Sequence, residues 1–74
     1  MPFVQIKLIE GVFSREQKRE LLSRVSEAVI SIEGENLRPY TVVSIDEVKS
    51  GDWAVGGKSM EADEVRALRS KKAG

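Results

Sequence analysis

Apolar residues follow changing periodicities along this chain of 74 residues. Residues 3–10 alternate imperfectly between apolar and polar side chains, which is the pattern of a half-buried β-strand. From residue 21 to residue 32 the apolar positions recur every three or four residues and form one stripe of a helix. Residues 40–48 are rich in β-branched side chains and predict a second strand. The order is therefore strand, helix, strand.

Local signals mark where these elements begin and end. Gly11 closes the first strand, and Ser14 is a good helix N-cap, with Gln17 three residues later completing a capping-box pattern. Gly34 ends the helix, and residues 35–39 are expected to be a connecting loop.

A strand, a helix and a strand joined by short loops form a βαβ unit. The fold class is therefore α/β, with parallel strands and a right-handed helical crossover. Two strands and one helix cannot enclose a core, so we expect the sheet to be completed by oligomerisation.

The C-terminal third contains smaller elements. A turn over residues 49–52 leads to Trp53, and the paired Gly56 and Gly57 suggest a small hairpin. Residues 61–74 predict a short helix and a frayed basic tail. We interpret the acidic residues in the first turn of that helix as solvent-exposed and not as a metal cluster. We expect residues 1–74 to form a single domain.

Composition narrows the functions that this chain can have. Twelve basic and twelve acidic residues cancel, which argues against nucleic acid as a partner. The absence of Cys and His removes thiolate chemistry, zinc clusters and the commonest general base, and we expect neither a metal nor a cofactor. Neither a signal peptide nor a membrane-spanning stretch is visible, so we expect a cytoplasmic protein.

Pro2, directly behind Met1, is the candidate catalytic residue. Removal of Met1 would leave a secondary amine at the head of a strand, where it can act as a base or nucleophile. While Met1 is retained, the same nitrogen is a tertiary amide without basicity. The alternative is that a proline after the initiator methionine only protects the N-terminus.

Several motifs occur in an order and spacing that resemble the 4-oxalocrotonate tautomerase family. The resemblance covers about residues 2–60, apart from a one-residue insertion near residues 12–13. It rests on these pieces: Met1-Pro2, Gln5-Ile6, Glu10-Gly11, Glu16-Gln17-Lys18, Val25-Ser26-Glu27-Ala28, Asp46-Glu47-Val48 and Trp53-Ala54-Val55-Gly56-Gly57.

The resemblance implies a β-α-β tautomerase fold, dimers that share a four-stranded sheet, and a hexamer of three dimers. It implies that the Pro2 amine is the general acid/base that interconverts enol and keto forms of a small 2-hydroxy-dienoate-type acid, as in aromatic catabolism. It also places Trp53 in the substrate pocket. The alternative role of Trp53 is a hairpin anchor packed on the core, and the two roles are compatible. Enclosure of the Pro2 amine by apolar side chains would lower its pKa toward neutrality, where a general base is most effective.

The chain departs from this family where substrate is bound. Members acting on dicarboxylates usually carry an arginine just after the Glu-Gly and another in the second strand. Here those positions fall on Val12 or Phe13 and on Val42, which cannot replace a guanidinium. Arg15, expected in the first helical turn, and Arg38, expected in the loop before the second strand, are the candidate substitutes.

Three interpretations of the departure are open. In the first, the chain is one subunit of a hetero-hexamer, and a paralogous partner carries the arginines. In the second, it forms a homo-hexamer that acts on a less charged substrate. In the third, it is a non-catalytic relative kept for assembly. A fourth hypothesis, from a different class, is a small binding or scaffold module in which the Met-Pro start is incidental.

Overall fold

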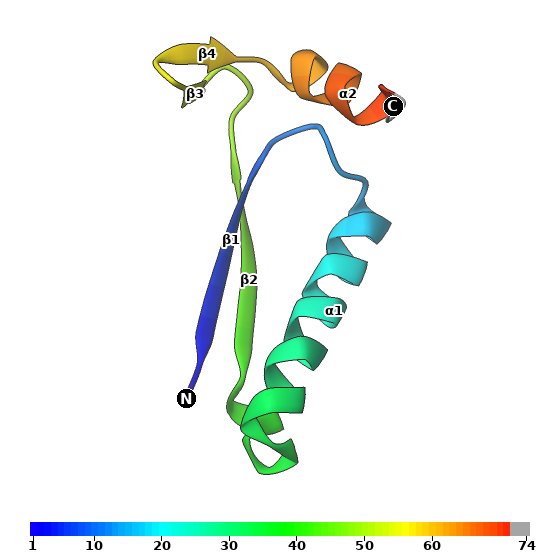
Figure 1. Ribbon diagram of the computed structural model, residues 1–74, viewed down its shortest axis with the longest axis vertical. Coiled ribbons are helices and arrows are strands. Elements are labelled where there is room, and N and C mark those ends of the chain that lie inside the picture. Colours follow the sequence, from blue (N-terminus) through cyan, green and yellow to red (C-terminus); the bar gives the residue numbers. More distant parts are fainter. Residues whose placement is uncertain (72–74) are drawn as a thin grey trace.

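The computed structural model describes residues 1–71. Two helices, a short 3₁₀-helix and four strands make up the described chain (Figure 1). In chain order they are β1 (Phe3–Ile9), α1 (Arg15–Glu33), the 3₁₀-helix η1 (Glu35–Tyr40), β2 (Val42–Val48), β3 (Trp53–Val55), β4 (Lys58–Met60) and α2 (Ala62–Ser70).

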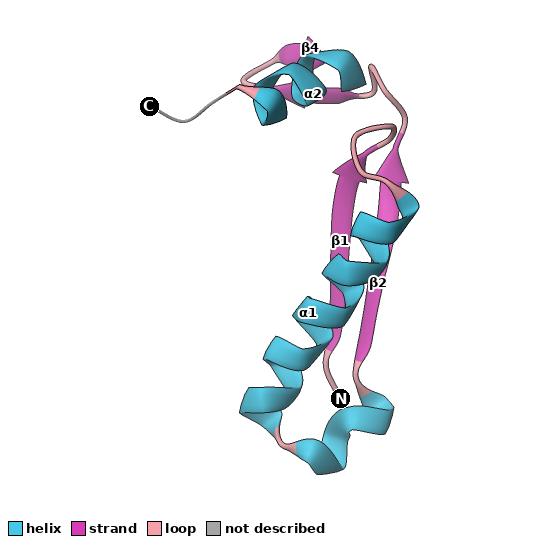
Figure 2. Cartoon of the chain, turned by 90° about the vertical axis from the view of Figure 1, so that its right-hand side faces the viewer, coloured by secondary structure: helices cyan, strands magenta, loops and turns pink. Residues whose placement is uncertain are grey.

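Strands β1 and β2 pair in parallel, from Phe3 opposite Val42 to Ile9 opposite Val48. Helix α1 connects them and lies along one face of this pair, as Figure 2 shows. The predicted βαβ unit is confirmed. An ion pair of 2.8 Å between Lys18 of α1 and Glu47 of β2 joins the helix to the sheet.

The predicted boundaries of α1 are also confirmed, and they arise from local hydrogen bonds. The Gln17 N–H donates to Ser14 Oγ at 3.1 Å, and the Ser14 N–H donates to Gln17 Oε1 at 2.9 Å, so two otherwise unpaired backbone donors are satisfied. Gly34 has a φ of 106°, which only glycine adopts without strain, and its N–H donates to the Ile30 carbonyl.

Residues 35–39, expected to be a loop, instead lie in the 3₁₀-helix η1. Its backbone turns are closed by short-range bonds, from the Leu37 N–H to the Gly34 carbonyl at 3.1 Å and from the Thr41 N–H to the Arg38 carbonyl at 3.3 Å. Such bonds span three residues and suit a tight connection of this length. As a consequence, β2 begins at Val42 and not at residue 40.

The predicted hairpin is confirmed as β3 and β4, and Trp53 pairs with Met60. The basic C-terminal segment, however, is not a solvated tail along its whole length. Residues 62–70 form α2, and Arg66 donates a hydrogen bond of 2.7 Å to the Gly11 carbonyl while Arg69 donates one of 3.0 Å to the Val12 carbonyl. The final basic residue, Lys72, lies outside the described residues.

The described chain has a small core and a large exposed apolar surface. Ile9, Val12 and Ala62 are buried together, whereas Phe3 is 66% exposed and Ile32 is 90% exposed. The radius of gyration is 15.1 Å, against about 11 Å for a compact chain of this length. The accessible surface is 5663 Å², about 1,100 Å² more than a folded monomer of this mass exposes.

Candidate functional site

Pro2 lies at the end of the sheet where both parallel strands begin. Its carbonyl accepts a hydrogen bond of 3.2 Å from the Val42 N–H, and this bond ties the N-terminal segment to the start of β2. Pro2 is half-buried, whereas Met1 before it is 87% exposed. Strand pairing therefore holds the Pro2 carbonyl at this end of the sheet, and the residue ahead of Pro2 is accessible.

Arg38 lies at the same end of the molecule, where it is held by two carboxylates. Its Nε and Nη2 donate to Glu35 at 2.7 and 2.9 Å, and its Nη1 and Nη2 donate to Glu27 at 2.7 and 3.1 Å. Hydrogen bonding to Arg38 is the main reason that the pKa of each carboxyl lies below its usual range. The same bonds, first to Glu35 and then to Glu27, raise the pKa of Arg38. This guanidinium joins η1 to α1 and has few donors left for a substrate.

Trp53 and Arg15 lie at the opposite end of the sheet. Arg15 is the first residue of α1 and is exposed. Trp53 packs against the buried cluster of Ile9, Val12 and Ala62. Because β1 advances about 3.3 Å per residue, its two ends are about 20 Å apart. Figure 1 shows the N-terminus at one end of the β1–β2 pair and β3 at the other. Within one chain, Pro2 and Arg38 are thus separated from Trp53 and Arg15 by the length of the sheet.

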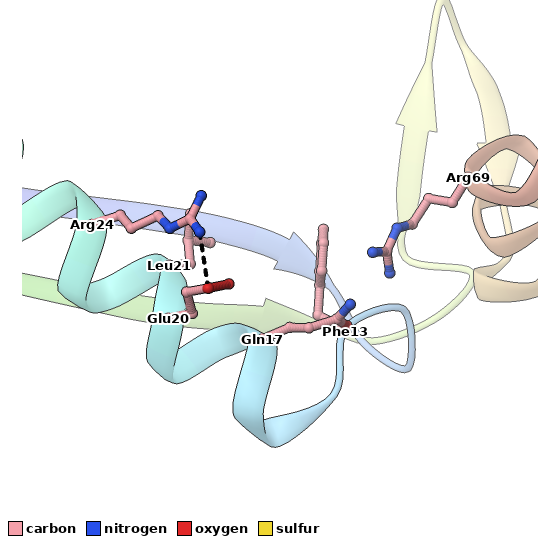
Figure 3. A pocket seen from close by; sticks show the side chains of 6 residues that line it. All are labelled: Phe13, Gln17, Glu20, Leu21, Arg24 and Arg69. Carbon is pink, nitrogen blue, oxygen red and sulfur yellow. Dashed lines mark hydrogen bonds and ion pairs between the residues drawn. The ribbon is translucent and has the colours of Figure 1, made fainter. Parts of the chain in front are cut away.

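A pocket of about 260 Å³ lies at this second end, between the first turns of α1 and helix α2. It is lined by Phe13, Gln17, Glu20, Leu21, Arg24 and Arg69. Figure 3 shows the Arg69 guanidinium directed toward Phe13 and the Arg24 side chain paired with Glu20. The carbon at the centre of the Arg69 guanidinium is 4.5 Å from the centroid of the Phe13 ring, a cation–π contact.

The sequence reasoning missed the arginines of α2 as members of this end of the molecule. A signal was present, because Ala62, Val65, Arg66 and Arg69 follow the i, i+3, i+4, i+7 pattern of one helix face. The apolar members of that face pack on the core, which brings both arginines against residues 11–13.

The site residues proposed from the sequence can therefore meet only across an interface. The Pro2 end of one chain would have to approach the Trp53 end of another. Among residues 1–71, no group of His, Cys, Asp or Glu is arranged to hold a metal ion. No helix in the same range is both long enough and apolar enough to cross a membrane.

Comparison with known proteins agrees with this fold. Residues 2–63 match the family model described as tautomerase enzyme. The 2-hydroxymuconate tautomerase of Bacillus subtilis is 40% identical over 60 residues, which cover 81% of this chain and 94% of that relative. The chain belongs to the tautomerase superfamily, and within it to the 4-oxalocrotonate tautomerase family.

Two solved structures of relatives are similar to this chain in both fold and sequence. DmpI of Helicobacter pylori is 37% identical, with 96% of this chain and 100% of that chain covered and a TM-score of 0.67. A heterohexamer 4-oxalocrotonate tautomerase of Chloroflexus aurantiacus is 33% identical. The match covers 89% of this chain and 100% of that chain, with a TM-score of 0.71. Family membership supports an isomerase activity of the tautomerase type.

Proposed function

We propose that this protein interconverts the enol and keto forms of a small 2-hydroxy-dienoate-type acid, with the amine of Pro2 as general acid/base. The observation that carries the proposal is a proline directly behind Met1, at the head of β1, in a chain of the tautomerase family that has no His and no Cys. The activity requires removal of Met1.

The chemistry of ketonisation assigns both proton transfers to one group. The Pro2 amine accepts the proton of the enol hydroxyl as the C=O bond forms, and the resulting ammonium returns a proton to the carbon end of the former double bond. Such a shuttle is effective when the nitrogen is within hydrogen-bond reach of both positions. The bond from the Val42 N–H to the Pro2 carbonyl supports this role, because it restricts where the amine lies.

Assembly of several chains follows from where the site residues lie. Pro2 at one end of the sheet and Trp53 at the other form a common pocket only if one chain provides the amine and another the aromatic side chain. The excess surface of about 1,100 Å² per chain exceeds the roughly 800 Å² that each partner buries in a standard interface. We propose a hexamer that completes the two-stranded sheet through neighbouring chains.

A hetero-hexamer with a paralogous chain is the second candidate, favoured by two specific observations. Val12 is only 7% exposed and belongs to the core, and Arg38 is bound by Glu27 and Glu35. Neither the family arginine position at Val12 nor the candidate substitute Arg38 therefore offers this chain a free guanidinium for a substrate carboxylate. Native mass spectrometry of this chain, purified alone and after co-expression with short Met-Pro chains of the same genome, distinguishes the two assemblies.

The test of the proposed function compares two forms of the same protein. The form without Met1 is expected to tautomerise 2-hydroxymuconate, and the form that retains Met1 is expected to be inactive although it assembles equally well. Intact mass identifies each form. Acylation of the Pro2 amine should abolish the activity of the processed form. Full activity of a chain that retains Met1, or of an acylated chain, would refute the role of Pro2.

A further inference from the structure

Helix α2 brings two guanidinium groups to the loop between β1 and α1. Arg66 donates to the Gly11 carbonyl at 2.7 Å, and Arg69 donates to the Val12 carbonyl at 3.0 Å. The two contacts resemble each other, since each joins a guanidinium of α2 to a backbone oxygen of the loop. They differ in what else each side chain faces.

Arg69 lines the pocket, and Arg66 does not. The floor beneath Arg69 is apolar, with the ring of Phe13 at 4.5 Å and Leu21 beside it. The second cation of the pocket, Arg24, is neutralised by Glu20 at 3.0 Å. Among residues 1–71 no carboxylate lies within ion-pair distance of Arg69. The pocket therefore combines one uncompensated guanidinium with an apolar wall.

We propose that Arg69 binds the carboxylate of the acid substrate, with Phe13 and Leu21 holding the adjoining carbon chain. The inference rests on the proposed function and adds the residue that recognises the acid group. Arg69 uses Nη1 for the Val12 carbonyl, which leaves donors on Nε and Nη2 in the planar arrangement that matches a carboxylate.

The geometry favours a small acid over a larger ligand. A volume of about 260 Å³ lies below the roughly 300–1,000 Å³ of pockets for drug-sized molecules. Trp53 packs on the same cluster as Phe13, so the acid would lie at the end of the chain that also carries this aromatic side chain. The side chain of Val12 is buried and uncharged, so it provides no cation in this loop. Helix α2 provides one instead, because Arg69, 57 residues further along the chain, donates to the backbone carbonyl of Val12.

The binding test uses probes that do not react. Adipate is the saturated six-carbon dicarboxylate, and adipamide is its neutral counterpart. Trp53 is the only tryptophan, so its fluorescence reports binding at this end of the chain. The assembled protein is expected to bind adipate and not adipamide, and Arg69→Gln is expected to weaken adipate binding by about tenfold or more.

Arg66→Gln is the matched control, because it removes the same kind of bond from α2 to the loop without removing the pocket cation. It is expected to leave adipate binding unchanged. Equal losses in Arg66→Gln and Arg69→Gln would overturn the proposal, since both arginines would then only anchor α2. Adipate binding that is absent in the unmodified protein, or intact in Arg69→Gln, would overturn it as well.

Kinetics separate this inference from the proposed function. Arg69→Gln is expected to raise KM for 2-hydroxymuconate by about tenfold or more and to leave the turnover of a neutral enol unchanged. An equal loss for both substrates would overturn a carboxylate-binding role. If no variant turns over either substrate but adipate binding follows Arg69, the proposed function fails while the binding site stands.

Discussion

Val42→Arg places a cation beside the proposed catalytic amine. Val42 opens β2, lies opposite Phe3, and is 42% exposed. Its backbone N–H, which donates to the Pro2 carbonyl, is kept in any substitution except proline. The arginine therefore adds a guanidinium next to Pro2 without opening a cavity or releasing the N-terminal segment.

The size of the expected gain follows from the chemistry of the added contact. A hydrogen bond to a charged group contributes about 1.5–3 kcal/mol, and about 1.4 kcal/mol corresponds to tenfold in rate or affinity. Val42→Arg is therefore expected to raise kcat/KM for 2-hydroxymuconate by about 10- to 150-fold. A neutral enol has no carboxylate to accept the bond, so its kcat/KM should change little.

The assay measures kcat/KM for both substrates in the unmodified chain, in Val42→Arg and in Val42→Gln. The glutamine variant is the control, since it adds a polar hydrogen-bonding side chain without charge. The ratio of the two kcat/KM values should rise only in Val42→Arg. An unchanged ratio, or an equal rise in Val42→Gln, would refute the idea that a cation is missing at this position.

Three further predictions concern stability. Ser14→Ala removes the N-cap of α1 and should cost about 0.5–2 kcal/mol, measured by denaturant unfolding. Thr41→Val removes the hydroxyl that donates to Glu33, whose other carboxylate oxygen is already buried without a partner, and should cost about 1–3 kcal/mol in the same assay. Because the folded pKa values of Glu27 and Glu35 are lowered, Arg38 stabilises the fold above the ordinary carboxyl pKa of 4.5, and this contribution is lost as the pH falls through the lowered values. Thermal melts of the unmodified protein and Arg38→Gln should therefore differ at neutral pH and converge in acid, and a difference that persists in acid would contradict the assignment.

Much of the fold could be predicted because its signals are local. The capping residues Ser14 and Gln17 and the glycine at position 34 act through neighbours in sequence, so the ends of α1 follow from the sequence alone. The conformation of residues 35–40 could not be predicted in the same way. Its short-range backbone bonds are accompanied by a contact between Arg38 and Glu27, which lies 11 residues earlier, and loop composition does not reveal that contact.

The candidate site was less predictable than the fold, because it brings together residues that are far apart in the sequence. The sequence predicts Arg15 and Arg38 only because they are close in sequence to positions where the family carries an arginine. The structure shows that Arg38 is engaged by two carboxylates, and that Arg69 reaches the Val12 backbone from α2. In the proposed hexamer Pro2 and Trp53 come together only across an interface. The apolar periodicity of one chain predicts such an interface only through the core that it leaves unfilled.

The role of Pro2 is tested most directly by following its ionisation and the reaction together. The processed protein, labelled with ¹⁵N-proline, is titrated by NMR, and the pH dependence of kcat/KM is measured under the same conditions. Since kcat/KM reports the ionisation of groups in the free enzyme, the pKa of the Pro2 amine should coincide with the pKa below which kcat/KM falls. A kcat/KM that stays constant while the Pro2 amine becomes protonated would contradict its role as the general base.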